Sequence, residues 1–193
     1  MDRLDPKTTV LLVIDVQEKL AAAMDPDALE RVVKNIGILV DSAKILGVPV
    51  VTSEQYPKGL GPTVLAVREK LPNAPHSKMT FDAASDLAIA RNLADLAPRA
   101  VVVVGMESHV CVFQTARELV RRGFDTHVVG DAVISRKDRN RKLGLSLCER
   151  AGAVITGTET GVVDLLGLAG NEHFKAISKL IREFPTWGSA PNP

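Results

Sequence analysis

The stretch Val101-Val-Val-Val-Gly-Met-Glu-Ser-His-Val-Cys111 decides how this chain folds. Four consecutive β-branched valines are typical of a strand that is buried on both faces of a parallel sheet. The segment after Ser108 has a helical pattern, which is expected over residues 110–122 and ends at Gly123. Cys111 therefore lies where a strand passes into a helix. Unpaired amides and the helix dipole favour an anion there, so the position predicts a thiolate rather than a thiol. The alternative is an unreactive cysteine that packs as a small apolar residue.

Strand and helix patterns alternate along the rest of the chain. Strands are expected over residues 9–15, 48–53, 74–78, 99–105, 124–129 and 153–156, and helices over residues 29–46, 85–96, 110–122, 137–151, 158–166 and 173–184. Ser85 is the expected N-cap of its helix, Gly47 the expected C-cap of the first one, and residues 185–193 a loose tail. This alternation predicts an α/β fold of three layers, αβα, with a six-stranded, mostly parallel sheet in the order 3-2-1-4-5-6.

Length and charge limit the classes of function. With 193 residues, the chain is expected to form one domain, residues 1–193. Its formal net charge of +1 gives no bulk electrostatic reason to bind nucleic acid or an anionic membrane. No apolar stretch reaches the roughly 18 residues that a spanning helix needs. The start lacks a signal-peptide pattern, and two cysteines are no disulfide framework, so a cytoplasmic location is expected.

Three chemically useful side chains fall at strand ends. Ligands of such sheets bind outside the carboxyl ends of the strands, where the strand order reverses, here between the first and fourth strands. Asp15 ends the first strand and Cys111 follows the fourth. A partly desolvated carboxylate suits proton transfer, although Asp15 could also be a helix N-cap or a solvated strand end. Lys78 ends the third strand, from which its ammonium could reach the same crevice and favour both anions; the alternative is a solvated loop lysine.

Three motifs in order carry a family resemblance. They are Leu12-Val-Ile-Asp-Val-Gln17, Ser77-Lys-Met-Thr-Phe81 and Gly105-Met-Glu-Ser-His-Val-Cys-Val112. With them the chain resembles the isochorismatase-like cysteine hydrolases, a family that includes nicotinamidases and N-carbamoylsarcosine amidase. The similarity runs from about residue 8 to residue 166, which is the expected core of the domain. The stretch Ser53-Glu-Gln-Tyr-Pro-Lys-Gly-Leu-Gly-Pro62 is most similar to the isochorismatase-domain subgroup.

The resemblance implies a catalytic triad of Asp15, Lys78 and Cys111. It also implies a non-proline cis peptide between Met106 and Glu107, which together with the backbone N–H of Cys111 shapes an oxyanion hole. The implied activity is that of a metal-independent, amidase-like hydrolase of a small amide, carbamoyl or related acyl compound. Such an enzyme would form a thioester on Cys111, with Asp15 as acid and base. The alternative is a thiol redox sensor, or a non-hydrolytic small-molecule binding module that retains the pocket.

Four further side chains are candidates for substrate binding: Gln17, Gln55, Tyr56 and Phe81. Core packing is the alternative for Tyr56 and Phe81, and an ordinary helix start is the alternative for Gln17. Nicotinamidases of the family hold a metal with an aspartate and two histidines after the second strand, whereas residues 52–60 contain no histidine, so we expect no metal and no cofactor. The resemblance implies a homo-oligomer: a dimer, a tetramer or a larger ring. The basic stretch over residues 136–142 is expected to be a solvated or intersubunit face, and Cys148 a core residue.

Overall fold

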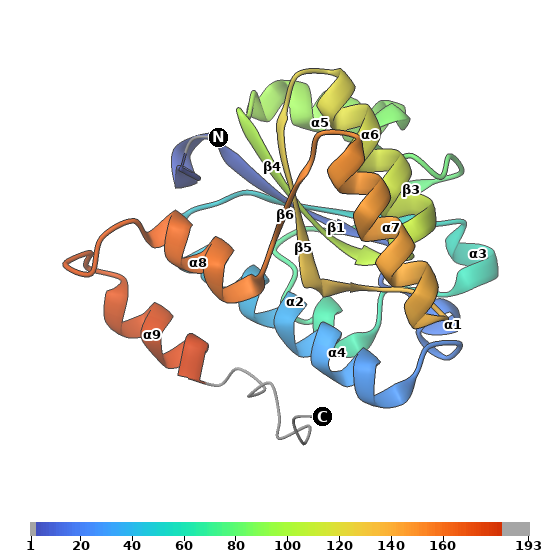
Figure 1. Cartoon of the computed structure of the whole chain (residues 1–193), viewed down its shortest axis with the longest axis horizontal. Helices are drawn as coiled ribbons and strands as arrows, with labels where there is room; N and C mark the ends of the chain where they lie inside the picture. The colour runs from blue at the N-terminus through green and yellow to red at the C-terminus, as the bar shows by residue number, and fades with distance from the viewer. Residues whose placement is uncertain (1–2, 183–193) are drawn as a thin grey trace.

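The computed structural model describes residues 3–182 and has a central parallel sheet (Figure 1). The strand order is β3-β2-β1-β4-β5-β6, and every neighbouring pair is parallel. The strands are β1 (Thr9–Ile14), β2 (Val50–Gln55), β3 (His76–Lys78), β4 (Ala100–Met106), β5 (Asp125–Ile134) and β6 (Val154–Thr156). The expected α/β architecture and strand order are therefore confirmed.

Helices cover both faces of the sheet (Figure 1). They are α1 (Glu18–Ala21), α2 (Pro26–Leu46), α3 (Pro57–Leu60), α4 (Leu65–Arg68), α5 (Leu87–Leu96), α6 (Phe113–Arg121), α7 (Asp138–Arg150), α8 (Thr158–Leu166) and α9 (Phe174–Arg182). Buried residues of α2, α8 and α9 share one apolar cluster, whereas α5, α6 and α7 contribute to a second cluster on the opposite face. The sheet is thus the middle layer of three.

Strand β1 shows why the central strands are apolar throughout. Leu11 and Val13 belong to the cluster under α2, whereas Val10, Leu12 and Ile14 belong to the cluster under α5 and α6. Side chains alternate between the faces of a strand, so a strand covered on both faces must be apolar at every position. The pairing of β1 with β4 ends at Ile14 and Gly105. Asp15 and the segment that carries Cys111 consequently leave the sheet side by side.

The cap of α2 confirms one local expectation, and the cap of α5 corrects another. Gly47 ends α2 with a left-handed φ of 71°, which suits a glycine at a helix C-terminus. Ser85 was wrong as the N-cap of α5, because it lies in the 3-10 helix Ala83–Ser85. The carboxylate of Asp86 caps α5 instead and accepts from the N–H groups of Ala88 and Ile89. A carboxylate also interacts more favourably than a hydroxyl with the positive end of a helix.

Several element boundaries differ from the expectation: α2 begins at Pro26 instead of residue 29, and β2 runs to Gln55 instead of residue 53. Strand β5 continues five residues beyond 129 to Ile134, because the pairing with β4 resumes after an irregularity between Val103 and Gly105. The last expected helix is α9 as far as Arg182; its end at residue 184 and the tail over residues 185–193 lie outside the described residues. Within residues 3–182, no helix is both long and apolar enough to span a bilayer.

Candidate active site

Asp15 is held in place by the end of strand β2. Its backbone is left-handed, with a φ of 49°, and its N–H donates to the carbonyl oxygen of Ser53 at 3.1 Å. The hydroxyl of Ser53 donates to Asp15 Oδ1 at 2.7 Å. Asp15 is fully buried. The turn at residue 15 therefore directs a carboxylate out of the ladder, and its neighbour on β2 fixes one of its two oxygens.

Lys78 binds the second carboxylate oxygen of Asp15. Its Nζ donates to Asp15 Oδ2 at 2.7 Å and to Gln55 Oε1 at 2.7 Å, and it also approaches the carbonyl oxygens of Thr80 and Phe81 at 3.1 and 3.4 Å. Both charged side chains are 0% exposed. A buried charge is tolerated only when it is paired and its hydrogen bonds are satisfied, and this ammonium meets both conditions. Asp15 and Lys78 consequently form a rigid, buried ion pair.

Cys111 lies in a π-helical turn, Ser108–Val112, between β4 and α6. The N–H groups of Val110 and Val112 both donate to the carbonyl oxygen of Glu107, and the bond from Val112 closes the wide turn typical of a π-helix. The peptide bond between Met106 and Glu107, which opens the turn, is cis. π-Bulges often occur at functional sites. The sequence predicted an ordinary helix here, since no pattern of apolar residues distinguishes one π turn from an α turn.

The expectation of a thiolate at Cys111 was wrong. The pKa of the thiol is raised from its ordinary 9.0 to about 12. Burial is the largest cause, since only 6% of the residue is exposed, and the negative charge of Asp15 is the second. The positive charge of Lys78 lowers the pKa, but by less than burial and Asp15 raise it. A hydrogen bond with Asp15 and the negative charge of Glu107 raise the pKa further. The resting residue is a thiol beside a carboxylate, because burial and the charge of Asp15 raise its pKa more than the charge of Lys78 lowers it.

Glu107 directly precedes this turn and is itself buried. Its carboxylate accepts from the backbone N–H of Arg136 at 3.0 Å and from Arg136 Nε at 3.1 and 3.2 Å. Arg136 follows strand β5, so this contact joins the ends of β4 and β5 beside Cys111. From the sequence, Arg136 was expected only on a solvated or intersubunit face. A pair 29 residues apart leaves no local signal in a sequence.

The predicted substrate-binding residues occupy two different environments. Gln17 is fully buried, and its amide contacts backbone atoms of Gln55 and Gly61. Gln55 is also engaged, because Oε1 accepts from Lys78 and Nε2 donates to the carbonyl oxygen of Met79. Tyr56 and Phe81 are 48% and 55% exposed, in the segments that follow β2 and β3. The two glutamines therefore support the Asp15–Lys78 pair, and the two aromatic rings remain open to a ligand.

Ser53 is the site residue that sequence reasoning missed as an individual contact. It belongs to the loop motif that carried the resemblance, yet its role depends on register. In the parallel pairing, Ile14 lies opposite Ser53, so the next residue of β1 turns its carboxylate toward the Ser53 hydroxyl. One signal could have identified Ser53. It is a polar residue near the end of one expected strand, next to a neighbouring strand that ends in aspartate.

Gly144 lets helix α7 lie directly against the cysteine turn. A Cβ at this position would lie 2.5 Å from the carbonyl carbon and 2.6 Å from the carbonyl oxygen of Ser108, and 2.6 Å from His109 N. These are backbone atoms of the turn that carries Cys111, so they cannot rotate away. Because residue 144 has no side chain, the backbone of α7 can pack directly against the backbone of Ser108 and His109.

We expect Gly144→Ala to destabilise the protein by about 1–3 kcal/mol through overpacking and to change the alkylation rate of Cys111. Gly161→Ala is the matched control, since Gly161 also lies within a helix but a Cβ there would meet nothing within 4 Å. That control should be neutral or stabilising by up to about 1 kcal/mol. Urea unfolding and the iodoacetamide reaction measure both effects. Equal changes for the two variants would contradict the role of Gly144.

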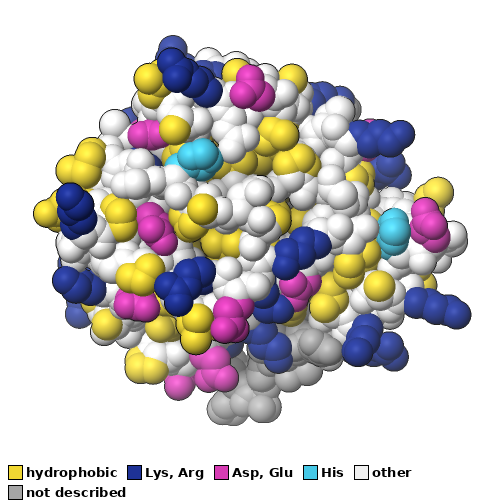
Figure 2. All heavy atoms as spheres, turned by 180° about the vertical axis from the view of Figure 1, so that it is seen from behind, with side chains coloured by type: hydrophobic (Ala, Val, Ile, Leu, Met, Phe, Trp, Pro, Cys, Tyr) yellow, Lys and Arg dark blue, Asp and Glu magenta, His cyan; other side chains and the backbone are white. Residues whose placement is uncertain are grey.

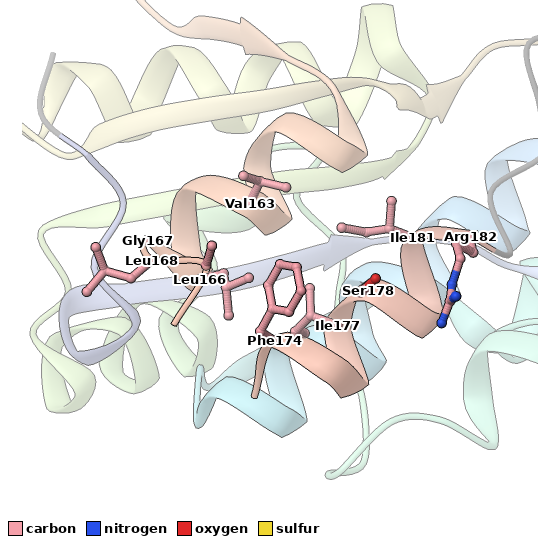
Figure 3. Close-up of a pocket in the computed structure, with 10 residues that line it drawn as sticks. Val163, Leu166, Gly167, Leu168, Phe174, Ile177, Ser178, Ile181 and Arg182 are labelled. Carbon is pink, nitrogen blue, oxygen red and sulfur yellow. The ribbon is translucent and has the colours of Figure 1, made fainter. Parts of the chain in front are cut away.

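Among the residues that the structure describes, neither a metal-binding cluster nor the apolar groove between α8 and α9 lies at this site. Within the described range of residues, no group of three or more His, Cys, Asp or Glu side chains could hold a metal ion. A groove of about 210 Å³ lies between α8 and α9, lined by residues such as Val163, Leu166 and Phe174 (Figure 3). It shares no residue with the Asp15–Lys78–Cys111 cluster. The candidate active site therefore lies at the carboxyl ends of β1, β3 and β4.

Comparisons with known proteins agree with this geometry. Residues 9–160 match the isochorismatase domain. The secreted isochorismatase effector Isc1 of Phytophthora sojae (strain P6497) is 39% identical over 189 residues, covering 95% of this chain and 89% of the relative. Isochorismatase domain-containing protein 2 of Danio rerio is 36% identical over 181 residues, covering 93% and 89%. The structure of MAR1 ribonuclease from Caenorhabditis elegans has a TM-score of 0.90 and 36% identity, and the match covers 100% of this chain and 99% of that one. The chain belongs to the isochorismatase family.

Proposed function

We propose that this protein is a metal-independent cysteine hydrolase of a small amide, carbamoyl or related acyl compound. The observation that supports it most is the position of Asp15, whose two carboxylate oxygens are fixed by Ser53 and Lys78 while the carboxylate also borders the Cys111 thiol. A carboxylate held in this way keeps one orientation toward the Cys111 thiol, with which it can exchange a proton. General bases act over hydrogen-bond distance, and orientation by a third group is a common mark of an activated nucleophile.

The raised pKa of Cys111 determines when the thiol loses its proton during the proposed reaction. The thiol stays protonated at neutral pH, so its sulfur attacks the substrate carbonyl as Asp15 takes the proton. Backbone N–H groups at the start of the π-helical turn, including that of Cys111, are the donors proposed for the oxyanion; one such donor typically contributes about 3–4 kcal/mol. Asp15 then returns the proton to the departing amine, and water, deprotonated by the same carboxylate, hydrolyses the thioester. Lys78 holds the carboxylate throughout.

The alternative of a thiol redox sensor has less support. Sensor cysteines are accessible and have a low pKa, because the thiolate is the species that reacts with oxidants. Cys111 is buried, and its pKa is raised. An acid–base pair of this kind serves hydrolysis but has no part in the oxidation of a thiol.

Trapping the acyl intermediate tests the proposal. We expect a panel of short aliphatic amides and N-carbamoyl compounds, quenched in acid, to yield a substrate whose acyl group replaces the thiol hydrogen of Cys111 as the amine leaves. Mass spectrometry of peptides locates the adduct, and hydroxylamine should release it, as for any thioester. Cys148, fully buried in α7, is the internal control and should remain unmodified. Reversible oxidation of Cys111 without any adduct across the panel would instead support the sensor.

RNA belongs in the same panel because the similar protein from C. elegans is named a ribonuclease. We expect no cleavage of a single-stranded oligonucleotide. The chain has a formal net charge of +1, and charged side chains of both signs are interspersed on the face seen in Figure 2. Binding of a polyanion requires a continuous positive surface. Cleavage that disappears in Cys111→Ala would contradict the proposed substrate class.

A further inference from the structure

The groove between α8 and α9 is apolar along nearly all of its lining (Figure 3). Of its lining residues, which all lie in the part of the chain that the structure describes, only Ser178 and Arg182 have polar side chains. Its walls include exposed apolar residues, since Val163 is 48% and Phe174 41% exposed. Single exposed apolar side chains are ordinary on a protein surface, whereas adjoining ones that line a hollow mark a place where another apolar group binds.

Both walls of this groove are anchored in the protein core. Leu166 of α8 and Ile177 of α9 are buried and belong to the same apolar cluster as α2. The connection between the two helices is closed by hydrogen bonds, since Asn171 Nδ2 donates to the Leu166 carbonyl oxygen at 3.0 Å and Phe174 N donates to the Asn171 carbonyl oxygen at 3.0 Å. The groove is therefore preformed, and its occupant does not have to order it first.

The sequence supplies an apolar occupant directly after α9. Residues 183–187, which lie outside the described residues, read Glu-Phe-Pro-Thr-Trp, and Trp187 is the single tryptophan of the sequence. Arg182, where α9 ends, itself lines the groove. Five residues of extended chain reach roughly 17 Å, whereas a helix advances roughly 12 Å over the eight residues from Phe174 to Arg182. The Trp187 ring can therefore reach the whole length of the groove along α9.

We propose that Trp187 of the same chain occupies this groove, with residues 183–187 folded back along α9. The sizes agree, because an apolar cavity of about 150 Å³ binds benzene, and this groove has about 210 Å³ for the larger indole ring. The Ser178 hydroxyl offers an acceptor for the indole N–H, which usually has a partner when it is buried. A tethered segment also has a high effective concentration at the groove, and Pro185 limits the conformations that the segment loses on docking.

Tryptophan fluorescence of the full chain tests the proposal, because one residue supplies the whole tryptophan signal. We expect the emission maximum of the folded protein to lie at a shorter wavelength than that of a synthetic peptide of residues 180–193, and acrylamide to quench the emission several-fold less. Val163→Glu places a charge in the groove wall and should shift the emission to that of the peptide. Leu143→Glu is the matched control, since Leu143 is 52% exposed on α7, and its emission should equal that of the wild type. Urea unfolding checks that both variants fold.

Co-expression of two variants identifies which chain supplies the indole. Trp187→Ala keeps the groove without the ring, and Val163→Glu keeps the ring without an intact groove. Their mixture should emit as Val163→Glu alone does, because each ring belongs to the groove of its own chain. Recovery of the wild-type emission in the mixture would show docking into a second copy and would overturn the proposal. So would a wild-type protein whose emission matches the peptide, or a folded Val163→Glu variant whose emission is unchanged.

Discussion

Cys111→Ala is expected to eliminate the acyl adduct and to lower turnover of the true substrate by about 10⁴-fold or more, as the loss of a nucleophile does in other covalent hydrolases. The fold should survive. The residue belongs to the apolar cluster that α6 helps to form, and such a substitution typically costs about 1 kcal/mol. Steady-state kinetics, intact-protein mass spectrometry and urea unfolding measure the three quantities on one preparation.

Cys148→Ala separates this effect from that of losing a buried thiol. Cys148 lies in the same apolar cluster as Cys111, is fully buried, and also has a pKa raised to about 12, here by burial alone. Its replacement should cost a similar amount of stability and leave turnover unchanged. If Cys111→Ala retained turnover, the proposed thioester would be excluded.

Lys78→Met is expected to lower the free energy of unfolding by about 3–5 kcal/mol, because it leaves the Asp15 carboxylate buried without its cation. Methionine is similar to lysine in length, so packing changes little. The carboxylate loses one hydrogen bond, and Gln55 Oε1 loses its donor. The hydrolase activity should fall as well, since Asp15 is no longer held in one orientation. Urea unfolding at pH 7 gives the stability.

The double variant Lys78→Met with Asp15→Asn distinguishes charge from packing. Removing both charges should recover much of the lost stability, because no uncompensated ion remains. A surface control is Lys142→Met, whose ammonium pairs with Asp138 at 2.9 Å while both side chains are largely exposed. That substitution should change stability by less than about 1 kcal/mol. A double variant no more stable than Lys78→Met would show that lost packing, and not an unpaired charge, causes the destabilisation.

The fold and the meeting of Asp15 with Cys111 could be predicted because both follow from chain order. Buried strands that alternate with helices leave few topologies, and the reversal of strand order brings the ends of β1 and β4 together. Lys78 was harder, since a strand of only three residues gives a weak pattern, and the family motif supplied most of its assignment.

The rest of the site could not be predicted because it depends on contacts between distant segments. The pairing of Glu107 with Arg136 and the approach of Gly144 to Ser108 are set by how α7 packs on the sheet. The protonation state of Cys111 depends on how deeply the turn is buried. A helix start and a nearby lysine predicted a thiolate, but neither reveals the desolvation that raises the pKa of this thiol.

The side chain of Gln17 has a consequence for how Asp15 can act. In an uninterrupted parallel ladder, residue 15 would accept from Gln55 N–H, and residue 17 would donate to the Gln55 carbonyl oxygen. Here Gln17 Oε1 accepts from Gln55 N and Gln17 Nε2 donates to Gln55 O, at 2.7 and 3.1 Å. One primary amide thus substitutes for a missing length of main chain. Both backbone groups of Gln55 therefore keep a hydrogen-bond partner, and the chain at residue 15 is free to leave the sheet and turn its carboxylate toward Lys78.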